Sequence, residues 1–345
     1  MSTSRAPDLQ PLLDYVRDTR HVDLTGLEGS GLTEQVQQRM RDVGADDLAS
    51  YLHVLRGRPA ELGLLFDAIL TDRSWLDGSY DVYPRIERRF LAALDESLQP
   101  RGPEVLYDLV GRLGLPPMAS VADIGCGEGR HTVQLAERFG FGVQGIDPVQ
   151  RHTDLGNEAL ASAARRDPSL RDRVRFTLGT VEALPVGDGA VDLVWCRDAL
   201  VHFQRMDRAF AEIRRVMRAG GRAVIYSMFT TDRPQPPETD WLWSTFGNAP
   251  ASADRAAVEA AIVGAGLRVD EHVELGGEWG EWAEEQSTYG TRRLLHAARL
   301  IRARDRYLQE FGRAACDIML ADCFWHVYRL LGKLSGHIYV LSNPG

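Results

Sequence analysis

The sequence predicts an α/β fold in which a parallel sheet carries helices on both faces, with an all-helical segment before it. Three observations support this prediction. From residue 104 onward, short apolar runs alternate with amphipathic helical segments, which is the pattern of βαβ units. A glycine-rich turn follows the first apolar run, and an acidic residue follows the second. Residues 8 to about 100 show apolar residues at helical spacing without a strand pattern, so we expect only helices there.

The glycine-rich turn Gly125-Cys126-Gly127-Glu128-Gly129 connects an expected strand, residues 121–124, to an expected helix, residues 131–138. Glycines keep the backbone open to a ligand, and the N–H groups at the helix start favour an anion or a carboxylate. The second expected strand, residues 141–146, runs into Asp147, where an acidic residue can accept hydrogen bonds from ribose hydroxyls. The turn differs from the dinucleotide fingerprint, whose third glycine falls one position later, and no Walker-type Gly-Lys-Ser/Thr follows it. The pattern predicts a nucleotide-binding corner.

The later elements follow from the same two patterns. The remaining expected strands are short apolar runs at residues 173–178, 191–196, 221–228, 267–275 and 337–341. The remaining expected helices carry apolar residues at helical spacing and cover residues 104–114, 148–166, 205–218, 251–264, 288–311 and 314–331. Because the last two helices fall between the last two strands, we expect them to form an insert.

These motifs resemble those of the class I S-adenosylmethionine (SAM) methyltransferases. Asp123-Ile124-Gly125-Cys126-Gly127-Glu128-Gly129 is similar to the first motif of that family, and Asp147 stands at the position of its ribose-binding acid. Three further segments are similar to its adenine-side loop, its fourth strand with the loop after it, and the turn before its fifth strand: residues 179–185, 191–198 and 217–222. The five motifs occur in the family's order between residues 120 and 229. The resemblance implies a Rossmann-like sheet, SAM as the cofactor and S-adenosylhomocysteine (SAH) as its product.

The resemblance also implies a set of cofactor-binding residues: Asp123, Gly125, Gly127, Gly129, Asp147, Thr180, Val181, Glu182, Arg197 and Asp198. Asp123 is expected to face the methionine amine, Arg197 and Asp198 to lie beside the methionine half, and Val181 and Glu182 to flank the adenine. Thr180 stands where the family often has an aspartate, whose charge a hydroxyl cannot supply. Structural alternatives are a partner for the helix start at Asp123 and a surface ion pair between Arg197 and Asp198.

Two histidines are candidates for a general base in methyl transfer. His202 closely follows the fourth expected strand, and His326 lies off the apolar stripe of the last expected helix. An imidazole can move a proton near neutral pH, although each ring can instead have a packing role. His131, at the start of the helix after the glycine turn, is expected to be structural or to lie on the cofactor side.

The predicted acceptor-binding residues are aromatic and acidic: Trp241, Trp279, Glu281 and Trp282. Five of the seven tryptophans lie after residue 240, and residues 277–285 mix tryptophans with glutamates. Such a mixture can bind an amine through ring faces and carboxylates. The alternative is a solvated acidic turn that two core indoles anchor.

The turn residues Pro100-Arg101-Gly102-Pro103 predict a domain boundary. Residues 1–100 are then a helical cap or dimerisation domain. Residues 101–345 form the SAM-binding methyltransferase domain, with a helical lid insert at about 276–333.

The N-terminal part has a resemblance of its own. Residues 50–55, 61–62 and 69–71 are similar to the helical N-terminal domain of the chemotaxis-receptor methyltransferases. The aromatic-aromatic-arginine signature of that family is absent, and Ser74-Trp75-Leu76-Asp77-Gly78 stands in its place. We therefore transfer no residue role from this resemblance.

The composition limits the partners and the location. A net charge of −9 in 345 residues argues against a nucleic-acid acceptor, because phosphate binding draws on clustered lysines and arginines. The four cysteines form no Cys-x-x-Cys pair, which predicts free thiols in a reducing cytoplasm and no bound metal. No apolar leader or membrane-spanning run is present in the sequence, so we expect a cytoplasmic protein.

Together these patterns predict a SAM-dependent methyltransferase that moves a methyl group to a small-molecule acceptor, such as a specialised metabolite, by in-line displacement. Two alternatives remain open: a protein carboxyl methyltransferase, which the N-terminal resemblance suggests, and a SAM-binding protein that transfers no methyl group. The expected partners include neither nucleic acid nor a membrane, and a homodimer is one option for its assembly.

Overall fold

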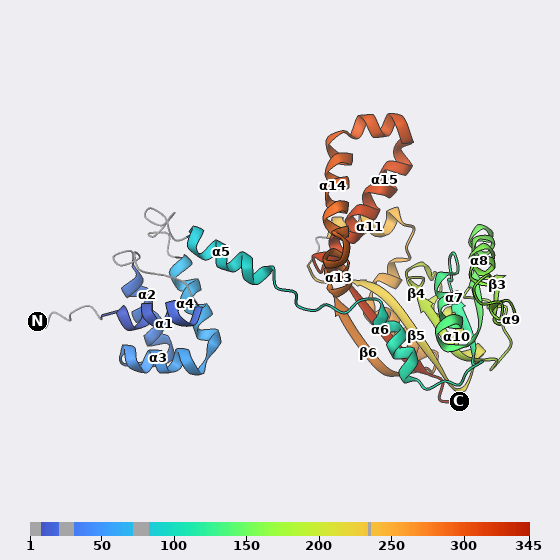
Figure 1. Ribbon diagram of the computed structural model, residues 1–345, viewed down its shortest axis with the longest axis horizontal. Helices are drawn as coiled ribbons and strands as arrows, with labels where there is room; N and C mark the ends of the chain where they lie inside the picture. The colour runs from blue at the N-terminus through green and yellow to red at the C-terminus, as the bar shows by residue number, and fades with distance from the viewer. Residues whose placement is uncertain (1–7, 21–30, 72–82, 234–235) are drawn as a thin grey trace, which may run out of the picture. The chain divides into compact units, whose positions relative to one another are not determined.

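The computed structural model describes residues 8–20, 31–71, 83–233 and 236–345. Residues 74–78, where the chemotaxis-receptor signature is missing, lie outside the described part. The chain divides into two compact units, Met1–Leu98 and Gln99–Gly345, which Figure 1 shows in blue to cyan and in cyan to red.

The first unit contains only helices in its described part: α1 (Gln10–Arg20), α2 (Leu32–Val43), α3 (Leu48–Gly57), α4 (Pro59–Thr71) and α5 (Tyr83–Leu94). Local signals set the ends of these helices. The Asp47 side chain accepts a hydrogen bond from the Ser50 N–H and caps α3, and Gly44 ends α2 in a left-handed conformation. The apolar stripes of the first four helices meet in one core, which includes Leu12, Val36, Tyr51, Leu55 and Leu65. The predicted all-helical segment is thus confirmed.

A buried ion pair lies beside this core. The guanidinium of Arg39 donates two hydrogen bonds to the carboxylate of Glu61, at 3.0 and 2.7 Å, and the Tyr51 hydroxyl donates a third at 3.1 Å. The side chains of Arg39 and Glu61 are only 17% and 6% exposed. Removing the cation would leave the Glu61 carboxylate buried without its counter-charge, which is strongly destabilising.

Arg39→Ala is therefore expected to lower the free energy of unfolding of the first unit by about 3 kcal/mol. Hydrogen exchange of the full chain checks this, because the amides of α2, α3 and α4 should exchange roughly 100-fold faster. The matched control is Arg41→Ala, which removes an exposed arginine from the same helix. Equal protection in the two variants would contradict a stabilising role for the buried pair.

The second unit is built on a seven-stranded sheet in the order β3-β2-β1-β4-β5-β7-β6. The strands are β1 (Ser120–Ile124), β2 (Gly142–Asp147), β3 (Val174–Leu178), β4 (Val191–Arg197), β5 (Met217–Thr230), β6 (Arg268–Gly276) and β7 (Leu334–Ser342). β1 to β5 are parallel, as predicted, whereas β7 is antiparallel to both β5 and β6. The parallel part therefore has one continuous edge at which its strands end.

Helices cover both faces of this sheet. They are α6 (Glu104–Arg112), α7 (Arg130–Phe139), α8 (Gln150–Ala163), α9 (Leu170–Arg173), α10 (Met206–Val216), α11 (Pro236–Thr245) and α12 (Arg255–Gly264), with short 3₁₀ helices η2 (Leu200–His202) and η3 (Pro250–Ala253). Residues of α6 and α7 share one core with Trp195 of β4, and residues of α10 and α12 share the other core with Cys196. Successive strand residues point to opposite faces, so β4 contributes to both cores and the predicted fold class is confirmed.

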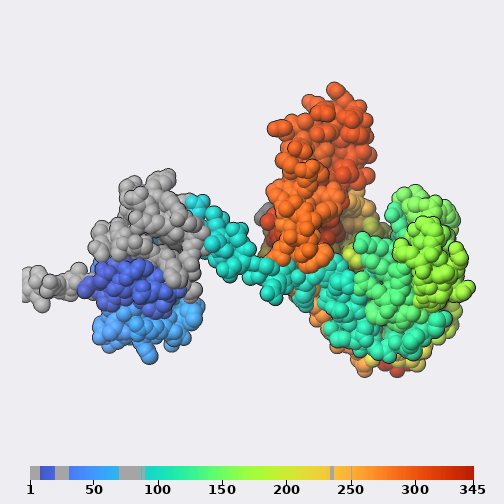
Figure 2. Space-filling view, in the orientation of Figure 1, coloured from blue at the N-terminus to red at the C-terminus, as the bar shows by residue number. Residues whose placement is uncertain are grey.

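The helical insert between β6 and β7 consists of α13 (Glu278–Ser287), α14 (Tyr289–Arg302) and α15 (Arg304–Leu330). In Figures 1 and 2, α14 and the first half of α15 project beyond the rest of the second unit. The break expected between residues 311 and 314 is present at Gly312, whose φ of 78° and ψ of 166° are non-helical and separate two helical stretches of α15. The further break at Ala303, between α14 and α15, was not expected. None of the described helices has the length and apolar character that a membrane span requires.

Two other expected elements also differ in the structure. The expected helix 251–264 is a 3₁₀ turn followed by α12, because Asp254 interrupts it and caps α12 by accepting from the Ala256 N–H at 2.9 Å. The acidic segment 277–285, for which one interpretation was a turn, is mostly the helix α13. This difference places the glutamates and tryptophans of the segment at helical spacing.

Candidate active site

The register of the parallel strands brings the predicted site residues to one edge of the sheet. Ile124, the last residue of β1, lies opposite Ile146 of β2 and Cys196 of β4. The glycine turn, Asp147 and Arg197 follow these positions, so all of them lie at the carboxyl ends of adjacent strands. Ligands of open parallel sheets bind at this edge.

The three glycines of the turn have different surroundings. All three adopt positive φ, 68° at Gly125, 51° at Gly127 and 78° at Gly129. A Cβ atom at Gly125 would collide with Ala199, and one at Gly129 would collide with the ring of Phe176. A Cβ atom at Gly127 would meet no atom within 4 Å. Gly125 and Gly129 therefore allow close internal packing, while Gly127 leaves its backbone face open, as a ligand lying against the turn requires.

Asp147 is held in place by three donors. The Gly127 N–H donates to Oδ2 at 3.0 Å, and the Val149 N–H donates to Oδ1 at 2.9 Å. Nδ1 of His152 lies 3.0 Å from the same Oδ1. A carboxylate can accept about four hydrogen bonds, so Asp147 can still accept one from a ribose hydroxyl. The structure joins the glycine turn and the predicted ribose acid by a direct hydrogen bond.

Asp123 is a buried carboxyl at the end of β1. Only 2% of the residue is exposed, and the Thr132 hydroxyl donates to Oδ2 at 2.6 Å. Burial raises the pKa of Asp123 to about 7, and the charge of Asp147 raises it further, while the Thr132 hydrogen bond and Arg197 act in the opposite direction. The ammonium of a bound methionine half would favour the ionised carboxylate at this position.

The raised pKa of Asp123 predicts how cofactor affinity depends on pH. Between pH 4 and about 7, folded cofactor-free protein keeps a proton on Asp123 that the unfolded chain has released. This group therefore lowers the free energy of unfolding as the pH rises through that window.

Binding of an ammonium requires the ionised form of Asp123, so affinity for SAH is expected to increase about tenfold from pH 6 to pH 8. Titration calorimetry at pH 6, 7 and 8 checks this, and Asp123→Asn should weaken binding and remove the pH dependence. An equally steep dependence in the variant would rule Asp123 out as its source.

A hydrogen-bond chain fixes Arg197 at the end of β4. The Tyr107 hydroxyl donates to Oε1 of Gln134 at 2.5 Å and lies 2.6 Å from Nδ1 of His131. Nη1 of Arg197 lies 2.8 Å from Nε2 of His131, and its guanidinium lies 5.3 Å from the ring centre of Trp279. Burial, followed by the charge of Arg197, lowers the pKa of His131 to about 3. A neutral His131 that donates from Nδ1 to Tyr107 and accepts at Nε2 from Arg197 satisfies the whole chain.

Asp198 follows Arg197 in an unusual backbone conformation, with φ 60°. Its N–H donates to the Tyr226 carbonyl at 3.2 Å, and its Oδ2 lies 3.5 Å from Nε of Arg197. The side chain is 54% exposed. Partial burial raises its pKa, while the charges of Arg197, Arg329 and His326 lower it. The structure thus brings two residues of α15 close to the end of β4.

The two candidate bases lie in different places. His202 lies in η2 and is exposed. Partial desolvation of its ring lowers the pKa of His202, and the charge of Asp147 has a smaller, opposite effect. His326 lies on α15, with Nε2 3.6 Å from Asp322 and 3.4 Å from the Tyr289 hydroxyl. His202 is therefore near the predicted ribose acid, whereas His326 is near Asp198.

The predicted adenine-side residues follow β3. The Gly179 N–H donates to the Asp147 carbonyl at 3.1 Å, which attaches this loop to the end of β2. Val181 is buried, Glu182 is half-buried, and Thr180 is exposed and forms a β-bridge with Ala183.

The predicted acceptor residues are not gathered at one point. Trp279 is buried, stacks on Tyr226 with ring centres 4.1 Å apart and lies under Arg197. Trp282 instead packs against Gly102, where a Cβ atom would lie 2.7 Å from its ring. Trp241 packs edge-on against Phe324 of α15, and Glu281 is half-buried on α13. Of the four, Trp279 is the residue that contacts Arg197.

The sequence analysis missed Tyr107, Gln134 and Arg329. Tyr107 and Gln134 lie on separate helices and act through His131, which no spacing in the sequence reveals. Arg329 lies three residues after His326 on the same helix, and this spacing places two side chains on one helix face. That signal was present in the sequence.

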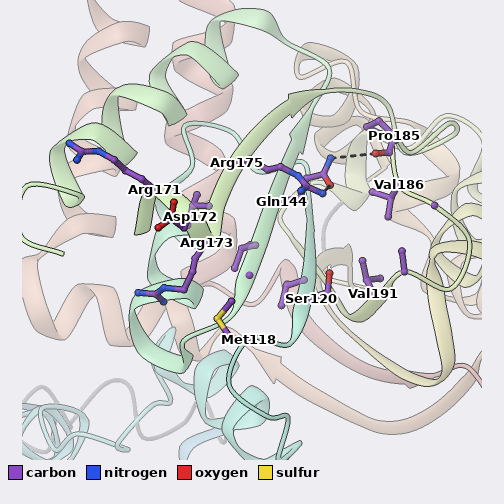
Figure 3. A pocket seen from close by; sticks show the side chains of 16 residues that line it. Met118, Ser120, Gln144, Arg171, Asp172, Arg173, Arg175, Pro185, Val186 and Val191 are labelled. Carbon is purple, nitrogen blue, oxygen red and sulfur yellow. Dashed lines mark hydrogen bonds between the residues drawn. The ribbon is translucent and has the colours of Figure 1, made fainter. Parts of the chain in front are cut away.

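A separate cavity of about 430 Å³ lies at the opposite edge of the sheet, near the starts of β1 to β4 (Figure 3). Met118, Ser120 and Gln144 line it, and Nε2 of Gln144 donates to the Pro185 carbonyl at 3.4 Å. This cavity is distinct from the edge that carries the glycine turn. Within the described ranges, no three histidine, cysteine, aspartate or glutamate side chains group in a way that could hold a metal ion.

Comparison with known families agrees with this geometry. Residues 122–225 match the family described as methyltransferase domain, a range that includes the glycine turn, Asp147 and Arg197. Residues 7–70 match the family described as CheR methyltransferase, all-alpha domain, which confirms the second resemblance seen in the sequence.

Relatives and solved structures extend the comparison. The 27-O-demethylrifamycin SV methyltransferase of Amycolatopsis mediterranei (strain S699) is 26% identical over 268 residues, 76% of this chain and 90% of that protein. Methyltransferase GfsG of Streptomyces halstedii is 29% identical over 130 residues, 38% of this chain and 45% of that protein, so the match spans less than half of that relative.

The chain is also similar to a solved structure, the geranyl diphosphate C-methyltransferase of Streptomyces coelicolor A3(2) in complex with Mg²⁺, geranyl-S-thiolodiphosphate and SAH. The TM-score is 0.51 and the identity 19%, and the match covers 69% of this chain and 75% of that one. At this identity, the similarity concerns the fold. Together with the motifs at the sheet edge, the family matches show a class I SAM-dependent methyltransferase domain at residues 122–225 and, at residues 7–70, a helical domain of the chemotaxis-receptor methyltransferase type.

Proposed function

We propose that this enzyme transfers the methyl group of SAM to a small-molecule acceptor that binds beneath the helical insert. The observation that carries the proposal is the position of α15. Its end packs against α13 at Gly280, where a Cβ atom would lie 2.8 Å from the Leu330 backbone, and the neighbouring Trp279 ring has its centre 5.3 Å from the Arg197 guanidinium at the end of β4. An insert this close to the sheet edge favours a small acceptor over a folded protein surface. The names of the relatives, a rifamycin and a geranyl diphosphate methyltransferase, support the same class of acceptor.

SAM supplies a methyl group on a sulfonium, and the chain supplies binding and alignment. We assign the open backbone at Gly127 and the carboxylate of Asp147 to the nucleoside, with Gly125 and Gly129 shaping the turn. Val181, Glu182 and Thr180 would lie on the adenine side. Asp123 would accept from the methionine ammonium, and Arg197, held by His131, would bind the methionine carboxylate beside Asp198.

We propose that the two histidines have different roles. His326 is next to Asp322 and on the acceptor side of Asp198, so it is placed to take a proton from the acceptor. His202 is near Asp147 and would affect the cofactor instead. Trp279 is the proposed aromatic wall near the reacting groups, while Trp241, Glu281 and Trp282 would shape the more distant part of the acceptor space.

His326→Ala is therefore expected to lower kcat about 100-fold with little change in the affinity for SAH. His202→Ala, the matched histidine variant, is expected to change SAH affinity more than kcat. Steady-state kinetics and titration calorimetry separate the two effects. If kcat stayed normal in His326→Ala, this histidine would not be the base.

The test of the proposed function is incubation of the full chain with methyl-labelled SAM and a panel of small metabolites that includes acids, amines and alcohols. Label is expected in a small molecule, with SAH formed in equal amount. Label transferred only to protein, released as methanol after base treatment, would favour the protein carboxyl methyltransferase that the N-terminal family match makes the second candidate. Binding of SAM without any SAH formation would favour the SAM-binding alternative.

We further propose a cytoplasmic location, which the four free cysteines support, because disulfides are rare in that compartment. The first unit is a proposed cap or dimerisation element, and a homodimer is one assembly that it could support. The net charge of −9 supports the proposal that nucleic acid is not the acceptor.

A further inference from the structure

Arg329 differs from the other arginines of the helical insert because it is half-buried and forms no ion pair within the described ranges. Arg293 forms an ion pair with Asp322 at 2.6 Å, and Arg304 forms one with Asp317 at 3.2 Å. The exposed arginines of the insert are Arg292, Arg299, Arg302, Arg306 and Arg313. Arg329 is half-buried, and across the described ranges no carboxylate forms an ion pair with its guanidinium. The charge of Arg329 acts on the Asp198 carboxylate, but no ion pair forms between them, so the guanidinium has donors that a ligand can use.

Arg329 lines a small cavity between α13, α14 and α15. The cavity measures about 70 Å³, and its lining also includes Gly280, Ala283, Tyr289, Gly290 and His326. The Tyr289 ring meets the His326 ring edge-on, with centres 4.8 Å apart. The cavity is therefore large enough for a carboxylate or phosphate group but not for a whole metabolite.

The cavity offers hydrogen-bond donors to an anion. One carboxylate, that of Glu284, lies beside Gly290 of the lining and accepts from the Thr291 N–H at 3.0 Å. Arg329 contributes a guanidinium, which can bind two oxygens of one anion in a planar fork, and Tyr289 contributes a hydroxyl. The nearby carboxylate of Asp322 is neutralised by its ion pair with Arg293. Arg329 also acts electrostatically on Asp198 and on Tyr226 of β5, so the cavity adjoins the end of the sheet where methyl transfer is proposed.

We propose, building on the proposed function, that the acceptor carries a carboxylate or a phosphate group and that Arg329 binds this group in the cavity. The anion would anchor one end of the acceptor, and the atom that receives the methyl group would lie toward Asp198. Such an anchor contributes to catalysis by alignment, since it restricts the acceptor to orientations that face the methyl group.

The experiment is titration calorimetry on the full chain saturated with SAH, so that the methionine carboxylate already occupies the cofactor side. The probes are sodium acetate and inorganic phosphate, which distinguish a carboxylate from a phosphate preference. The variants are Arg329→Gln and the matched control Arg313→Gln, an exposed arginine of the same helix. At least one probe should bind the wild type, Arg329→Gln should weaken that binding at least tenfold, and Arg313→Gln should leave it unchanged. SAH affinity should be equal in all three proteins.

Three results would overturn the inference while leaving the proposed function intact: no binding of either probe to the wild type, equal binding to Arg329→Gln, or a loss of SAH affinity in Arg329→Gln. The last result would assign Arg329 to the cofactor. A wild-type protein without SAH affinity would instead refute the proposed function, and the inference would fail with it. With an acceptor from the labelled panel, Arg329→Gln should raise the KM of the free acid at least tenfold and leave that of its methyl ester unchanged.

Discussion

Gly127→Ala is expected to fold normally and to lose at least tenfold in affinity for SAH, whereas Gly129→Ala is expected to lose about 3 kcal/mol of stability. Both glycines have positive φ, so each alanine carries a backbone cost of about 1 kcal/mol. The difference arises from the surroundings of the new methyl group. At residue 129 it would collide with the ring of Phe176, which adds the cost of overpacking a core, about 2 kcal/mol. At residue 127 it would enter open space, which is where the bound nucleoside is expected to approach the backbone.

Thermal unfolding of cofactor-free protein and titration calorimetry with SAH measure the two effects separately. A third variant, Gly114→Ala, is the control for the backbone cost alone, because Gly114 also has positive φ, has no atom near its Cβ direction and lies before β1. If Gly127→Ala bound SAH as tightly as Gly114→Ala does, the open face at residue 127 would not be the cofactor cradle.

The sequence predicted the positions of those candidate site residues that depend on a single local segment. The glycine turn is set by three glycines within five residues, and Asp147 is set by the end of the next strand, so the order of the motifs was sufficient to predict both. Parallel strand order then predicted that their ends would meet at one edge. The Gly127 to Asp147 hydrogen bond is a consequence of that order.

The parts that the sequence did not predict depend on contacts between distant segments. Arg197 was assigned by family resemblance, but its fixed position depends on His131 and Tyr107, which belong to two other helices. The raised pKa of Asp123 depends on burial, which a sequence does not quantify. Trp282 was grouped with Trp279 because they are close in sequence, yet helix geometry turns them in different directions, one toward Gly102 and the other toward Tyr226.

The breaks in the insert were predicted in part. Helical periodicity predicted a break near residue 312, and Gly312 does adopt a non-helical conformation between two helical stretches of α15, but the break at Ala303 was not predicted. Intrinsic propensity is a weak guide where packing between two long helices decides the ends. The stretch of α15 after Gly312 carries Asp322, His326 and Arg329 on one helix, and this is the helix 314–331 that the sequence predicted.

Asp147→Asn is expected to weaken SAH binding by about 3 kcal/mol, roughly 100-fold, which is the scale of losing charge-assisted hydrogen bonds in a partly buried site. The change removes the negative charge that a ribose hydroxyl would meet. It also introduces amide hydrogens that cannot accept from the Gly127 and Val149 N–H groups, so one of these donors loses its partner. Both effects act on the proposed cofactor site.

The matched control for this prediction is Asp154→Asn on α8, an exposed aspartate whose carboxylate accepts from the Gln150 side chain. Titration calorimetry gives the affinities, and thermal unfolding of the cofactor-free proteins shows whether the turn itself has changed. A large loss of affinity with a small change in Tm would assign Asp147 to the ligand. If Asp147 served only its three protein donors, the substitution would instead lower Tm. Affinity equal to that of Asp154→Asn would remove the ribose assignment, and with it the link between the glycine turn and SAM.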